Sequence, residues 1–331
     1  MKIYNAEGWV NWDYLCDLSS SFLMVVGARG TGKTYGLMKH LIEKHQPFIY
    51  LRRLQSQLDI CKTESGNPFR KLNIDMGMDI RAKRQSKSVE FYNGDVLICV
   101  GVALSTVATV RGFDFSAYDY IVFDESIPMV GEKPIKQEFS AFLNFYETVN
   151  RNRELSGQSA VKAILLGNAN QLINPYFTGW HFTKTALKMI RGGQMVYNTP
   201  DKSRIMVLLM NSPISKQKAE TALYKNADDD FLAMAIDNAF RTDATIIGSR
   251  PLKEYIHIVS IGEIGIYKHK SKREYYVCSV KSEPYYDDFG MSLKLFRNDF
   301  AMLRLIYMTK KLFIFESYEE EILFRNYIKL E

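Results

Sequence analysis

The sequence predicts an α/β protein in which a domain built on a parallel sheet is followed by a smaller α/β domain. Three observations lead to this class. A glycine-rich loop stands between an apolar run and a helical pattern at residues 22–44, and apolar runs then alternate with helical patterns to about residue 210. Beyond about residue 210, the composition and the spacing of apolar residues change. We expect a first domain at 1–210, a helical linker at 211–250 and a second domain at 251–331.

The glycine-rich loop, residues 27–34, reads Gly-Ala-Arg-Gly-Thr-Gly-Lys-Thr and matches the phosphate-loop pattern G-x-x-x-x-G-K-[ST]. Its glycines let backbone N–H groups close around phosphates, and the following helix adds its positive end. The flanking strand and helix disfavour a chance match in a turn. We expect ATP here, with Lys33 on the β- and γ-phosphates and the Thr34 hydroxyl on Mg²⁺. The other loop positions expected to hold the nucleotide are Gly27, Arg29, Gly30, Thr31 and Gly32.

Continuous apolar runs define the strands that follow the loop. Buried strands separated by helices favour a parallel sheet that is covered on both faces. An Asn-Gly pair between two apolar runs predicts a hairpin. The predicted strands lie at 48–51, 120–123, 163–166 and 205–210, the hairpin at 89–100 and an amphipathic helix at 136–149.

An acidic pair, Asp124-Glu125, follows the apolar run at 120–123. An aspartate at the end of a strand beside the phosphate loop can hold Mg²⁺, and the adjacent glutamate can act as general base toward the attacking water. The alternative is that the pair caps the next turn. Because the pair ends a buried strand of the same domain, we favour an ATPase with Glu125 as its catalytic base.

Three further polar residues are candidates for the same site. Asn168 follows the run at 163–166 and is a candidate sensor of the γ-phosphate, although Gly-Asn is also ordinary turn chemistry. Arg151 and Arg153 close the helix predicted at 136–149. Either can complete a neighbouring subunit's site as an arginine finger. Favourable charge at a helix C-terminus is an equally balanced alternative for both.

Two basic runs are candidates for contact with the phosphate backbone of nucleic acid, and solvated loops are the alternative. One run precedes the hairpin and is expected to be a loop, and the other lies between two strands of the second domain. Arg52-Arg53, at a strand end, can reach a pore, the nucleotide or a carboxylate, and the sequence does not choose. The candidates are Arg81, Lys83, Arg84, Lys87, Lys268, Lys270, Lys272 and Arg273.

The composition is that of an ordinary soluble globular protein, with 47% hydrophobic and 24% charged residues. A net charge of +6 weakly favours an anionic partner. The four cysteines lie far apart in the sequence, which disfavours a zinc site and a disulfide framework. No apolar run approaches the ~20 residues of a membrane span, so we expect no membrane partner.

Beyond residue 211, a helical pattern at 213–246 is followed by the elements of a small domain with an antiparallel sheet. Its predicted strands lie at 255–260, 264–267 and 275–280, and its predicted helices at 292–307 and 317–329.

Together these motifs resemble the DNA-packaging motor ATPases of small tailed bacteriophages, which are relatives of the large terminase subunits. The phosphate loop and the acidic pair are shared by many ATPases, whereas the Arg-x-Arg segment and an Asn-Pro-Tyr-Phe run are more specific. In the family's order, the matching stretches are 26–34, 48–53, 121–125, 149–154 and Asn168-Ala169 with 174–177.

The resemblance implies an additional-strand P-loop ATPase that works as a homomeric ring, a pentamer, on the portal or connector of an empty capsid. Hydrolysis would drive double-stranded DNA inward. Arg151 matches the family's trans-acting finger, Arg111 matches a second basic residue at the subunit interface, and Arg153 is a further interface candidate. The protein would act in the host-cell cytoplasm, at the capsid vertex during assembly, and would be absent from the mature virion.

In large terminases the later domain is an RNase H-like nuclease built on clustered carboxylates. Here the strand predicted at 255–260 carries no acid, and Glu263, Asp287 and Asp288 form no convincing set. The resemblance therefore implies a vestigial nuclease fold that does not cut DNA. In the branch that packages unit-length genomes, this domain docks on the capsid vertex, in some members through a structural RNA, and the basic run at 268–273 would suit that contact or DNA.

Three alternatives remain. A helicase or recombination ATPase shares the same chemistry. A second alternative is a nucleotide-dependent binding switch with slow turnover. The pair Asp124-Glu125 disfavours this alternative. The third alternative is an assembly ATPase of filamentous phages, of the zonula-occludens-toxin type. Such proteins usually carry a membrane segment, for which no apolar run in this sequence is long enough.

Overall fold

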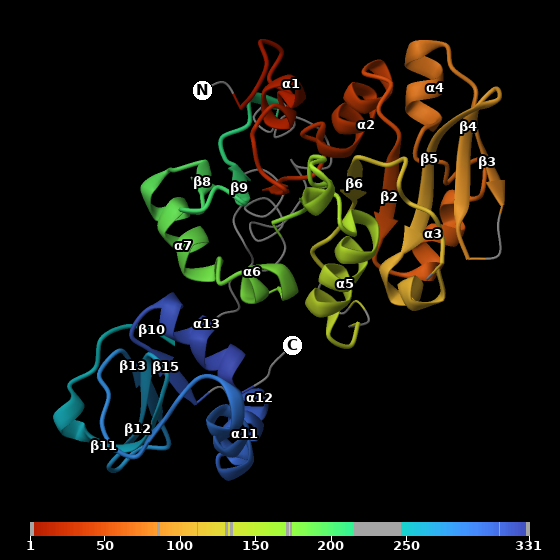
Figure 1. The fold of residues 1–331 in the computed structure, drawn as a ribbon. Coiled ribbons are helices and arrows are strands. Elements are labelled where there is room, and N and C mark those ends of the chain that lie inside the picture. The colour runs from red at the N-terminus through yellow and green to blue at the C-terminus, as the bar shows by residue number, and fades with distance from the viewer. Residues whose placement is uncertain are drawn as a thin grey trace. The chain divides into compact units, whose positions relative to one another are not determined.

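The computed structural model describes residues 3–84, 87–110, 112–129, 132, 135–169, 172, 174–214, 246–310 and 312–328. Contacts divide the chain into two units (Figure 1). The first comprises Met1–Gln171 and Lys188–Arg241, and the second Leu172–Leu187 and Thr242–Glu331. Residues 172–187 thus group with the second unit, although they precede the boundary predicted at residue 210.

The first unit is built on a nine-stranded sheet in the order β3-β4-β5-β2-β6-β7-β1-β9-β8. The strands from β5 to β9 in this order are parallel, and β3, β4 and β8 pair antiparallel at the edges. The predicted parallel sheet is therefore confirmed. The bounds are β1 (Phe22–Gly27), β2 (Phe48–Arg52), β3 (Ile80–Arg84), β4 (Val89–Asn93), β5 (Val96–Ala103), β6 (Tyr120–Phe123), β7 (Lys162–Gly167), β8 (Val196–Asn198) and β9 (Arg204–Leu209).

Strand β7 lies between β1, which leads into the phosphate loop, and β6, which leads into the acidic pair. This is the additional-strand arrangement that the resemblance implies. The central strands are apolar without alternation because both faces of the sheet are covered.

Strand β3 corrects the prediction that the first basic run is a loop, because Arg81 and Lys83 lie on an edge strand paired with β4. The buried Ile80 and half-buried Ala82 alternate with these two exposed basic residues. A strand with so few apolar positions gives a weak signal, and charge on an edge strand discourages pairing with other chains.

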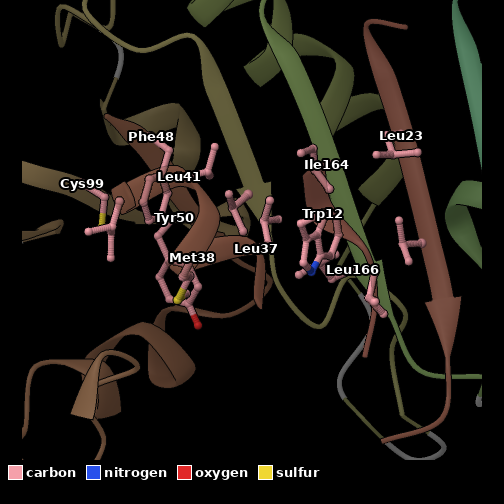
Figure 2. Close-up of a cluster of buried hydrophobic side chains, with 14 of the residues drawn as sticks. Trp12, Leu23, Leu37, Met38, Leu41, Phe48, Tyr50, Cys99, Ile164 and Leu166 are labelled. Atoms are coloured by element: carbon pink, nitrogen blue, oxygen red, sulfur yellow. The ribbon is translucent and has the colours of Figure 1, made fainter. Parts of the chain in front are cut away.

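The helices of the first unit cover this sheet. Figure 2 shows Leu37, Met38 and Leu41 of one helix, which all belong to the hydrophobic core, near Phe48 and Ile164 of the strands. Trp12 belongs to the same core. The bounds are α1 (Trp12–Cys16), α2 (Lys33–Glu43), α3 (Gln55–Cys61), α4 (Arg70–Met76), α5 (Glu138–Asn150) and the 3₁₀ helices Leu104–Val110 and Glu154–Ser156, and α7 (Thr183–Gly192) spans the boundary between the units.

The second unit holds a six-stranded sheet in the order β10-β15-β13-β12-β11-β14. Strands β11, β12 and β13 are antiparallel as predicted, but β10, β14 and β15 pair in parallel, so the sheet is mixed. The bounds are α6 (Pro175–Gly179), β10 (Ile246–Ile247), the 3₁₀ helix Leu252–Glu254, β11 (Tyr255–Ile261), β12 (Ile264–His269), β13 (Tyr275–Cys278), β14 (Tyr285–Tyr286), α11 (Gly290–Asp299), α12 (Ala301–Lys310), β15 (Phe313–Phe315) and α13 (Tyr318–Tyr327).

The single helix predicted at 292–307 is two helices, α11 and α12, which meet at Phe300. The Phe296 and Phe300 rings stack with centroids 5.5 Å apart, so apolar spacing continues across the break and periodicity alone does not reveal it. In the same unit, Lys184 contacts the carboxylates of Glu263 and Glu319, which ties residues 172–187 to the later sequence. Among the described residues, no helix is both long and apolar enough to cross a membrane.

Candidate nucleotide site

The candidate site lies where four consecutive parallel strands, β2, β6, β7 and β1, end at one edge of the sheet. Ligands of open parallel sheets bind outside the carboxyl ends of the strands. Here β2 ends in Arg52, β6 is followed by Asp124, β7 by Asn168 and β1 by the phosphate loop. The fold therefore gathers residues that are far apart in the sequence.

The phosphate loop turns sharply between β1 and α2. Gly30 and Gly32 have φ angles of 67° and 85°, a left-handed conformation that glycine adopts without strain. The Thr31 hydroxyl donates to the Ala28 carbonyl at 3.2 Å and is fully buried. The loop is thus fixed by its own side chains as it enters the helix.

The Lys33 side chain is buried within this loop. Its Nζ donates to the carbonyls of Gly27 at 2.9 Å and Ala28 at 2.6 Å, and to Oδ1 of Asn168 at 3.2 Å. Phosphate oxygens offer the same acceptor chemistry to an ammonium group. The bond to Asn168 brings the predicted sensor into the site.

Two side chains whose oxygens can bind a metal ion meet at the predicted Mg²⁺ position. The Thr34 hydroxyl donates to Asp124 Oδ1 at 2.7 Å, and Asp124 Oδ2 accepts from Tyr50 and from Arg52 Nη1, each at 2.9 Å. Burial, followed by the charge of Asp124, raises the pKa of Tyr50 well above its usual value, so this hydroxyl remains a donor. A hydroxyl and a carboxylate held side by side fit the oxygen preference of Mg²⁺.

Glu125 is held by the same arginine that contacts Asp124. Arg52 Nη2 lies 2.5 Å from Glu125 Oε2, so one guanidinium bridges both carboxylates. Glu125 has a φ of 51°, a conformation that costs a non-glycine residue roughly 1–3 kcal/mol. Arg52 thereby occupies one carboxylate oxygen of Glu125.

The neighbouring Arg53 is a structural residue. It is fully buried, and its Nε and Nη2 donate to the two carboxylate oxygens of Glu138 at 2.7 Å each. Its Nη1 lies 2.9 Å from Glu132 Oε2. Of the three targets that the sequence allows for Arg52-Arg53, both arginines thus reach carboxylates.

The two arginines beyond α5 differ in their surroundings. Arg151 is exposed and donates to the Phe113 carbonyl at 3.4 Å. Arg153 donates to Asp119 Oδ1 at 2.6 Å and to two backbone carbonyls of the same loop, which commits it within its own chain. Arg111 lies outside the described residues. This geometry favours Arg151 over Arg153 as the finger.

The first basic run is partly engaged. Arg81 pairs with Asp79 at 2.7 Å, whereas Lys83 and Lys87 are exposed. The side chain of Arg84 lies outside the described part of the chain. Lysines on this edge of the sheet are therefore available to a phosphate backbone, with no feature that selects one.

The second basic run begins in the last two residues of β12 and continues into the turn before β13, whereas the prediction places all of it between two strands. Lys268 belongs to β12, and Lys270, Lys272 and Arg273 are exposed beyond it. His269 Nδ1 accepts the backbone N–H of Lys272 at 3.0 Å, which shapes the turn. Lys270 donates to the Lys253 carbonyl at 2.6 Å.

The acidic residues of the second unit have separate partners. Glu263 contacts Lys184, and Asp288 accepts from the Tyr327 hydroxyl at 3.1 Å. Throughout the described ranges, no group of three or more His, Cys, Asp or Glu side chains could hold a metal ion. The vestigial nuclease fold stays a prediction.

The first residues of the chain also line the site, which the sequence motifs do not predict. A cavity of about 1120 Å³ runs from the phosphate loop to the N-terminal segment, and Trp9, Trp12 and Tyr35 line it together with Lys33. A signal was present, since two of the three tryptophans lie within the first twelve residues.

Comparison with known proteins agrees with this fold. The chain is 25% identical over 264 residues to the DNA packaging protein of Bacillus phage phi29, spanning 78% of this chain and 72% of that protein. It is 27% identical over 244 residues to the DNA packaging protein of Bacillus phage B103, spanning 72% and 70%.

Two solved structures share the fold of nearly the whole chain. The Phi-28 gp11 DNA packaging motor aligns over 99% of both chains with a TM-score of 0.62 and 21% identity. The bacteriophage Phi-29 viral genome packaging motor assembly aligns over 96% of this chain and 99% of that chain, with a TM-score of 0.61 and 19% identity. The family model of podovirus DNA encapsidation proteins (Gp16) matches residues 9–303, and the chain therefore belongs to this family.

Proposed function

We propose that this DNA-packaging protein uses ATP hydrolysis to move double-stranded DNA into a preformed capsid. The observation that carries the proposal is the 2.7 Å contact between Thr34 and Asp124, beside Glu125 and the buried Lys33. This arrangement supports metal-assisted phosphoryl transfer to water. The names of the similar proteins support DNA as the transported molecule.

Each residue of the site has a role in this proposal. Lys33 binds the β- and γ-phosphates, and Thr34 and Asp124 hold Mg²⁺, which supplies positive charge to the phosphates when bound. Glu125 orients the attacking water and accepts its proton. Asn168 senses the γ-phosphate, and its hydrogen bond from Lys33 supports this role. Arg52 holds one carboxylate oxygen of Glu125.

The assembly is part of the same proposal. We infer a homomeric ring, a pentamer, on the capsid connector, in which the exposed Arg151 completes the site of the next subunit. The two basic runs would contact DNA or a structural RNA through phosphates. The protein would work inside the infected host cell, at the capsid vertex, and would not cut DNA.

ATP hydrolysis with and without double-stranded DNA tests the proposal. Arg151→Ala mixed into unsubstituted protein should poison activity more than its fraction, because each mutant subunit disables a neighbour. Arg70→Ala, an exposed arginine of α4, is the matched control and should leave activity unchanged. Activity that ignores DNA and falls in proportion to the mutant fraction would contradict shared sites.

The alternatives predict other results. A helicase would separate the strands of a forked substrate, which a packaging motor does not require. A binding switch would show slow turnover, and its residual hydrolysis would not depend on Glu125.

A further inference from the structure

We propose that Trp9 stacks on the nucleobase of the bound nucleoside triphosphate, and that the hairpin of residues 3–12 forms the base-binding wall of the site. The inference rests on the proposed nucleotide site and adds a residue that recognises the base. The observations that support it are the hydrogen bonds between this hairpin and the phosphate loop.

Backbone and indole bonds pin the hairpin to the loop. Tyr4 and Val10 form an antiparallel bridge, and the Val10 N–H donates to the Thr31 carbonyl at 3.4 Å. The Trp12 indole Nε1 donates to the Gly32 carbonyl at 3.3 Å. The hairpin therefore moves with the loop that binds phosphates.

The two tryptophans have different roles. Trp12 is buried and packs on α2 at Gly36, where an added Cβ would lie 2.7 Å from the indole Cδ1. Trp9 is 39% exposed, although its ring covers Gly32, where an added Cβ would lie 3.1 Å from Cε3. An indole that is half open to water beside a phosphate loop offers a flat face to a base.

Trp9 is also preorganised. The Asn5 side chain accepts the Trp9 N–H at 2.9 Å, and the Asn5 N–H donates to the Trp9 carbonyl at 2.8 Å. A ring whose backbone is already fixed loses little conformational entropy when it stacks.

The cavity has room for a whole nucleotide. Its volume of about 1120 Å³ extends from Lys33 and Thr34 past Tyr35 and Lys39 of α2 to Trp9, and a triphosphate group alone would leave most of it unfilled. Tyr35 is fixed by its hydroxyl, which donates to Asp75 Oδ2 at 2.7 Å. A nucleoside that extends from the phosphates along this cavity meets the Trp9 face.

Affinities of ATP, GTP and inorganic tripolyphosphate for Trp9→Ala and Trp9→Phe test the inference. Stacking tolerates any base, so Trp9→Ala should weaken ATP and GTP alike, by about 5- to 150-fold. Tripolyphosphate has no base and should bind as before, which also shows that the loop is folded. Trp9→Phe should restore most of the affinity, and Trp180→Phe, in the second unit, is the control.

Three results would overturn the inference. Equal weakening of ATP and tripolyphosphate would mean that Trp9 only supports the loop. Unchanged affinity for all three compounds would place the base elsewhere. If the unsubstituted protein bound neither ATP nor tripolyphosphate, the proposed nucleotide site would be wrong as well. The first two results would leave that site intact.

Discussion

Replacing Arg53 with methionine would deprive the buried Glu138 and the partly buried Glu132 of their shared cation. Arg53 is fully buried and contacts Glu138 at 2.7 Å through two nitrogens and Glu132 at 2.9 Å through the third. Methionine fills irregular space with an unbranched chain but carries no charge. We expect the free energy of unfolding to fall by about 3–5 kcal/mol, the usual cost of removing one partner from a buried ion pair.

This loss is large beside the total stability of a domain, about 5–15 kcal/mol. For a domain of roughly 150–250 residues, each kcal/mol shifts the melting temperature by about 2–4 °C, so the variant should melt roughly 6–20 °C lower. The loss should also loosen the connection between β2 and α5, because Arg53 joins the end of one to the start of the other.

Thermal unfolding followed by tryptophan fluorescence in a Trp180→Phe background would measure the loss. The remaining reporters, Trp9 and Trp12, both lie in the first unit. Arg81→Met, which removes an exposed arginine from its pair with Asp79, is the matched control and should melt like the unsubstituted protein.

The double variant Arg53→Met/Glu138→Leu separates charge from packing. It should be more stable than Arg53→Met alone, because one of the two stranded carboxylates is gone. Strictly additive losses, or equal melting temperatures for Arg53→Met and Arg81→Met, would refute the reasoning.

Four further predictions concern the site and its support. Glu125→Gln should keep ATP binding and lower kcat by about 10²–10⁴, measured as phosphate release, and normal turnover would contradict its role as base. Asn168→Ala should lower kcat by about 10²–10³ with a smaller change in ATP affinity. Gly36→Ala, usually stabilising in a helix, should lower the melting temperature because the new methyl group meets Trp12, and a more stable variant would contradict this packing. Burial raises the pKa of Cys16 from 9.0 to about 12, so iodoacetamide should modify this thiol slowly at pH 8. The contribution of the protonated thiol to stability is complete below pH 9 and is lost as pH rises toward 12.

The elements that could be predicted from the sequence are those whose cause is local. Strand β6 has the bounds predicted for it, and β7 extends its predicted run by only one residue at each end, because strands covered on both faces are uninterrupted apolar runs. The phosphate loop and Asp124-Glu125 were found for the same reason, since each is a short motif at a strand end.

The partners of these residues could not be predicted, because they depend on distances along the chain that no local pattern spans. Arg52 and Glu125 are 73 positions apart, and their contact follows only from the neighbouring positions of β2 and β6. Trp12 meets Gly32 through a hairpin whose apolar positions are too few to give a periodic signal.

The division of the chain at residues 171 and 187 limits how the protein can be dissected. A fragment ending at residue 210 would keep Lys184 but lose Glu263 and Glu319, the carboxylates it contacts. After a single proteolytic cut between residues 214 and 246, Lys184 would still contact Glu263 and Glu319 on the other piece. Neither truncation nor nicking therefore yields two complete units. Activities measured on purified fragments would be lower than those of the intact chain.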